Sequence, residues 1–130
     1  SGYNLFLKLN MMVFKSDGKI GDFARLQLTV GRLQKVNHLV VRVDEGDVVS
    51  VAWEREEDLP SAGKEDKFMV AVLYADRSFS PELVKTSGET RGDGKATFRL
   101  QRKRGTAAHL YCFFREKDGK AYSPSQHVRI

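Results

Sequence analysis

The feature that most constrains the fold of this chain is an alternation of apolar and polar residues with a period of two, repeated in short segments. Over residues 47–54, Val49, Val51 and Trp53 would share one face of a strand, while small or polar residues take the other. A period of two is the pattern of a strand with one buried face. The chain is therefore predicted to be built from β-strands.

The same alternation recurs in six further segments. They are residues 24–30, 38–43, 66–76, 95–102, 108–116 and 121–130. Residues 66–76 carry apolar side chains on both faces, which predicts a central strand. Glycine, aspartate and proline clusters that favour turns separate the segments. About seven short strands of this kind predict an all-β, antiparallel β-sandwich. Residues 3–15 alternate too, but their composition favours a short helix packed on the sandwich.

The length and composition of the chain fit one compact domain. At 130 residues it can bury a single core. No apolar run approaches the roughly 18–20 residues of a membrane helix, so no membrane span is expected. The single cysteine, Cys112, cannot form an internal disulfide and is predicted to be a buried, unreactive thiol.

The order of the predicted strands over residues 36–130 resembles the fibronectin type III and immunoglobulin-like sandwich. The resemblance rests on "HLVVRV", "VVSVAWE", "KFMVAVLYA" and the closing "YCFFREKDGKAYSPSQHVRI". It implies that Trp53 packs in the core and that the last two strands form a hairpin across "EKDGKAYS". Residues 36–130 would then form the sandwich.

A second resemblance spans nearly the whole chain. Tyr3-Asn4-Leu5, "QLTVGRL", "VSVAW" and "REKDGKAYS" look like the C-terminal part of an uncharacterised bacterial domain-of-unknown-function family. The family supplies no activity. It implies that residues 1–35 form an extension packed on the sandwich, so that residues 1–130 make a single domain.

The tripeptide Arg91-Gly92-Asp93 is the one that adhesive fibronectin domains present to integrins. Here it precedes the predicted strand at 95–102, whereas in those domains it lies in the loop joining the last two strands. Glycine and aspartate are also what a tight turn requires. We therefore interpret residues 91–94 as a turn.

A basic cluster lies at the end of the strand predicted at 95–102. It consists of Arg99, Arg102, Lys103 and Arg104, in a chain with 22 basic and 17 acidic residues and a net charge of +5. Such a cluster could neutralise phosphates of a nucleic acid or another polyanion. The favoured alternative is a charged strand end that prevents pairing with other chains.

No catalytic, metal or cofactor site is predicted. The acidic loop at 54–67 lacks the ligand spacing of a calcium loop, and His38, His109 and His127 lack the spacing of a zinc site. His109 and His127 could approach each other if their strands pair. No glycine-rich phosphate loop or nucleophile motif is present, so the chain is predicted not to be an enzyme.

These observations favour a non-catalytic interaction or structural module that binds another protein through a sheet edge or loops. The first alternative is binding of a nucleic acid or polyanion by the basic cluster. The second is glycan binding by an aromatic platform, for which the candidates are Tyr74, Phe79 and Tyr122. Open strand edges would also allow weak homo-oligomers.

Overall fold

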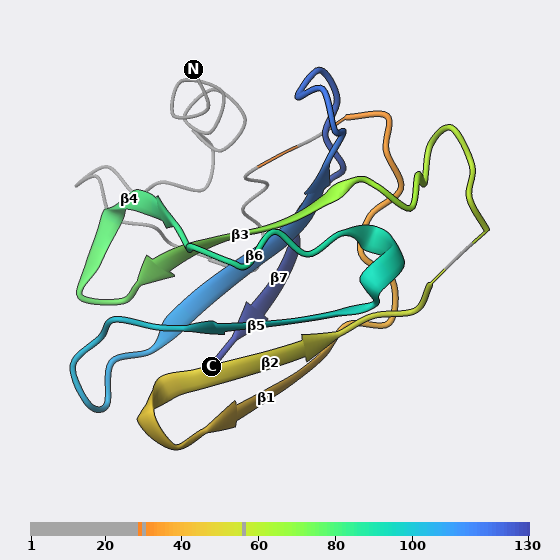
Figure 1. Cartoon of the computed structure of the whole chain (residues 1–130). Helices are drawn as coiled ribbons and strands as arrows, with labels where there is room; N and C mark the ends of the chain where they lie inside the picture. Colours follow the sequence, from red (N-terminus) through yellow and green to blue (C-terminus); the bar gives the residue numbers. More distant parts are fainter. Residues whose placement is uncertain (1–28, 30, 56) are drawn as a thin grey trace.

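The computed structural model describes residues 29, 31–55 and 57–130, and this part of the chain forms two packed sheets (Figure 1). Its strands are β1 (Val40–Asp44), β2 (Val48–Ala52), β3 (Lys67–Tyr74), β4 (Arg77–Leu83), β5 (Lys95–Arg99), β6 (Ala108–Arg115) and β7 (Gln126–Arg129). Two short 3-10 helices, η3 (Glu45–Asp47) and η4 (Arg91–Asp93), lie in turns. No helix in the described part of the chain is long and apolar enough to cross a membrane.

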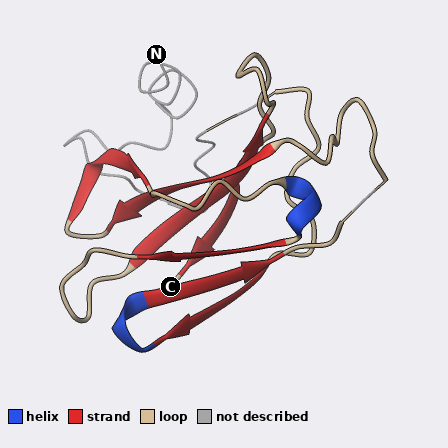
Figure 2. Cartoon of the chain, in the orientation of Figure 1, coloured by secondary structure: helices blue, strands red, loops and turns tan. Residues whose placement is uncertain are grey.

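The strands form one sheet in the order β1-β2-β5 and another in the order β4-β3-β6-β7. All pairs are antiparallel, and the two sheets lie as two layers (Figure 2). The predicted all-β, antiparallel sandwich is therefore confirmed. β3 is central as predicted, because it pairs with both β4 and β6.

The core between the sheets is centred on aromatic side chains. Trp53 is 7% exposed, and its ring stacks on Phe68 with centroids 4.4 Å apart. Phe114 meets the Trp53 ring edge-on at 5.7 Å. Val49 and Val51 of β2 are buried beside them. The alternation that predicted β2 thus marks the core face, and Trp53 takes the expected place.

The outer face of the larger sheet is also buried at its centre. Leu73 of β3 and Tyr111 of β6 have no exposed surface, although they alternate with the residues that face the other sheet. This agrees with the apolar side chains that residues 66–76 carry on both faces.

Strand β4 was not among the predicted strands. Among the described strands it pairs only with β3, and Leu83 is 67% exposed. An edge strand with serine and proline in it shows little apolar alternation, which is why the pattern missed it. The strand predicted at 121–130 is also shorter, since regular pairing begins only at Gln126.

The predicted N-terminal extension is described only at its end. Residues 3–15, and all but Thr29 of the strand predicted at 24–30, lie outside the described residues. Leu33 and Val36 are buried in the core, and the Leu33 N–H donates to the Tyr122 carbonyl at 3.2 Å. This end of the extension therefore packs on the sandwich.

Candidate binding groove between the two sheets

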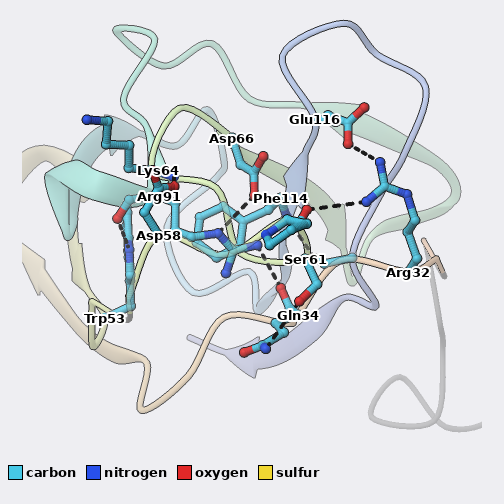
Figure 3. Close-up of polar contacts among 12 residues, drawn as sticks. Arg32, Gln34, Trp53, Asp58, Ser61, Lys64, Asp66, Arg91, Phe114 and Glu116 are labelled. Atoms are coloured by element: carbon cyan, nitrogen blue, oxygen red, sulfur yellow. Dashed lines mark hydrogen bonds and ion pairs between the residues drawn. The ribbon is translucent and has the colours of Figure 1, made fainter.

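The arginine of the Arg-Gly-Asp tripeptide is a core residue. Arg91 is 3% exposed, and its Nε donates to the Asp66 carboxylate at 3.0 Å. Its second guanidinium nitrogen donates to the Gln34 carbonyl at 2.9 Å, and the group lies over the Phe114 ring at 3.8 Å. Figure 3 shows this buried ion pair, with segments from distant parts of the chain meeting around one side chain.

The backbone around Arg91 forms the predicted turn. The Asp93 carboxylate accepts the Thr90 N–H at 2.8 Å, and Gly94 follows with a left-handed φ of 72°. The indole N–H of Trp53 donates to the Arg91 carbonyl at 2.9 Å. Because the Arg91 side chain is buried and bonded to Asp66 and to the Gln34 carbonyl, the tripeptide serves as a structural corner and does not present its arginine at the surface.

The four residues of the predicted basic cluster do not act together. Arg99, Lys103 and Arg104 are exposed. Arg102 is instead half-buried and makes a forked ion pair with Asp47, at 2.9 and 3.0 Å. It also donates to the Thr106 and Ile130 carbonyls, both at 2.9 Å. Arg102 thus ties η3 to the β5–β6 connection and to the residue that follows β7. The other three cations of the cluster stay exposed.

His109 and His127 approach each other, as their place in one hairpin allows. The Nδ1 of His109 lies 2.9 Å from the Nε2 of His127, and the rings stack with centroids 5.2 Å apart. Burial lowers the pKa of His109 to about 4, and the charges of His127 and Arg129 add to the effect. At neutral pH this buried His109 is therefore uncharged.

The remaining candidate residues form no reactive centre. Burial raises the pKa of the Cys112 thiol to about 12, as expected of a structural cysteine. Among the described residues, no three His, Cys, Asp or Glu side chains are grouped to hold a metal ion. Of the aromatic platform, Tyr74 is buried and Tyr122 is half-buried. The side chain of Phe79 lies outside what the structure describes.

A groove opens between β4 of one sheet and β5 of the other. It has a volume of about 470 Å³, within the range of ligand clefts in proteins. Its lining comprises Val72, Tyr74, Glu82, Leu83, Val84, Lys85, Thr86, Ser87, Arg99 and Gln101. The aliphatic side chains come from β3 and β4, whereas the cations Lys85 and Arg99 come from opposite walls. Figure 1 shows β4 and β5 in different layers.

Contacts around Arg77 and Tyr74 join the two sheets beside the groove, and we call them the clasp. The Gln101 N–H donates to the Tyr74 hydroxyl at 3.0 Å, and Arg77 donates to the Gln101 carbonyl, also at 3.0 Å. Arg77 stacks over the Tyr74 ring at 4.3 Å and pairs with Glu82 at 3.3 Å. The clasp joins the two walls, and it holds Glu82, the acidic residue of the groove lining, in an ion pair with Arg77.

Arg99, predicted as part of the basic cluster, lines the groove, whereas the sequence analysis singled out neither Lys85 nor Leu83. Both come at or just after β4, the strand that the pattern did not show. For the opposite wall the sequence did carry a signal. Lys95, Thr97 and Arg99 alternate with apolar residues, which places polar side chains on one face of β5.

Comparison with known proteins adds no relative: no family model and no curated protein matches this chain. The resemblance to a bacterial family of unknown function therefore stays a prediction, and the functional argument rests on the geometry of the molecule.

Proposed function

We propose that this protein is a non-catalytic interaction module of the fibronectin type III-like class, which binds an extended segment of another protein in the groove between β4 and β5. The strand order supports the class. β4 pairs with β3, and β5 is the last described strand of its sheet, whereas in the constant immunoglobulin arrangement the fourth strand joins the sheet of the first two.

The observation that carries the proposal is the groove itself. Its lining includes the aliphatic side chains of Val72, Leu83 and Val84, and it lies beside the edges of β4 and β5 with which no described strand pairs; a surface of this kind can receive an extended chain. Leu83 is 67% exposed on its wall. An exposed large apolar side chain beside a cleft is a typical contact for a partner.

The test is binding to an array of extended peptides, read with Leu83→Asp beside the wild type. The matched control is Val40→Asp, because Val40 is 65% exposed on β1 in the other sheet. We expect Leu83→Asp to weaken peptide binding about tenfold, whereas Val40→Asp leaves it unchanged. Equal effects of the two variants, or no peptide bound at all, would contradict the proposal.

A second candidate is polyanion binding by Arg99, Lys103 and Arg104, favoured by the exposure of all three. It predicts an affinity for nucleic acid that falls steeply with salt. The variant that tests it neutralises these three residues. Arg102 is left unchanged, because its ion pair with Asp47 stabilises the fold.

A further inference from the structure

We propose that the segment bound by this protein is acidic, and that it pairs with the open edge of β5 as a fourth strand of the smaller sheet. The inference rests on the proposed function and names the chemistry of the partner. It follows from three properties of β5: the direction of its backbone groups, its charges and the groove beside it.

The backbone of β5 offers a row of hydrogen-bonding groups to a partner. The Trp53 N–H donates to the Gly94 carbonyl, and the Leu100 N–H donates to the Asp47 carbonyl. These bonds fix the phase of the ladder, so Ala96 and Phe98 bond to β2. The N–H and C=O groups of the alternate residues point to the open edge, where no described strand pairs with them.

Those alternate residues are Lys95, Thr97 and Arg99, and their side chains are exposed. Neither Lys95 nor Arg99 forms an ion pair with any described residue. Opposite charges across neighbouring strands stabilise pairing. A strand added here would therefore be favoured by acidic side chains opposite Lys95 and Arg99.

The groove determines which side chains suit the other face of the added strand. Successive side chains of a strand point to opposite faces, so the residues between the acidic ones would point toward the groove. Val72 and Val84 line it, and Arg77 already pairs with its acidic residue Glu82. The partner segment should thus alternate acidic and aliphatic residues.

Other arrangements fit less well. A second copy paired antiparallel about Thr97 would place Lys95 opposite Arg99 at both ends, and like charges in this position are destabilising. β4 is a poorer edge, because Pro81 lies within it and has no N–H to donate. A nucleic acid would use the charges but neither the backbone groups nor the aliphatic lining.

The experiment measures binding of a labelled short peptide in which Glu and Val alternate, by fluorescence anisotropy at physiological salt. Comparison ligands are the same peptide with Lys in place of Glu, the acidic peptide with N-methylated backbone on one edge, and single-stranded DNA. We expect saturable binding of the acidic peptide and at least about tenfold weaker binding of the first two comparison ligands.

The protein variants are Lys95→Glu/Arg99→Glu and a control with the same change of charge, Lys35→Glu/Lys120→Glu, at exposed sites outside β5. Reversal on β5 should weaken the acidic peptide about tenfold and strengthen the lysine peptide, with the control unchanged. Equal loss in both variants, tolerance of N-methylation, or stronger binding of DNA through the same residues would overturn the inference.

The two proposals can fail separately. If peptides bind and Leu83→Asp weakens them, but the charge of peptide and of β5 has no effect, the groove function stands and the acidic partner is wrong. If no peptide of any charge binds, both proposals are wrong.

Discussion

Arg91 shows how a single charged residue can organise a core. Its guanidinium meets Asp66, the Gln34 carbonyl and the Phe114 ring, so three separate segments depend on it. Removing one partner of a buried ion pair leaves the other charge without compensation, which is more costly than losing the attraction itself.

We therefore expect Arg91→Ala to lower the free energy of unfolding by about 3–5 kcal/mol, measured by urea denaturation. Arg104→Ala, at an exposed arginine, should change it by less than about 0.5 kcal/mol. The double variant Arg91→Leu/Asp66→Leu should be less destabilised than the sum of its single changes, since no charge is left unpaired. Additive losses would mean that the pair is not coupled.

At the scale of the elements, the connection after β5 is held by Arg102. Its guanidinium makes two hydrogen bonds to Asp47 of η3. It also donates to the carbonyls of Thr106, in the β5–β6 connection, and of Ile130, which follows β7. The bond from Arg102 also lowers the pKa of Asp47 below its usual value of 3.8. Asp47 thus adds stability above about pH 4, which is lost as the pH falls through its folded pKa.

Arg102→Gln should therefore destabilise the fold by about 1–3 kcal/mol at neutral pH, because half-buried acceptors lose a charged donor. Lys103→Gln, one position away and exposed, serves as the control and should have almost no effect. Thermal denaturation of both proteins checks this. Equal melting temperatures for the two variants would show that the Arg102 contacts carry no stability.

How far the sequence predicts an element depends on where that element lies. The alternation of Val49, Val51 and Trp53 predicts β2 correctly, because one face of this strand is buried and the other is more exposed. β4 lies at the edge of the described sheet, and its sequence, with two serines and a proline, shows no regular apolar alternation. Arg91 could not be placed in the core, because its partner Asp66 lies 25 positions away and Gln34 lies 57 positions away. His109 and His127 could be brought together, since both belong to one hairpin.

At the scale of the whole molecule, His109 couples stability to pH. The unfolded side chain takes up a proton near pH 6.5, whereas burial holds the folded pKa at about 4. Between these values the unfolded chain binds more protons, so acidification favours unfolding. The contribution of Asp47 changes only at lower pH, which separates the two effects.

We expect the free energy of unfolding to fall by up to about 3 kcal/mol between pH 7 and pH 4, measured by urea denaturation. His109→Gln should flatten this slope whatever its effect on stability at pH 7. A wild-type stability that is constant over this interval would contradict the role assigned to His109.

The bond from the Trp53 indole to the Arg91 carbonyl has a spectroscopic consequence. Trp53 is the chain's one tryptophan, and it lies where β2, η4 and the ring of Phe68 meet. Its emission should shift to the red when that corner opens and water reaches the ring. Intrinsic fluorescence of the unlabelled protein thus reports whether the two sheets are closed on each other.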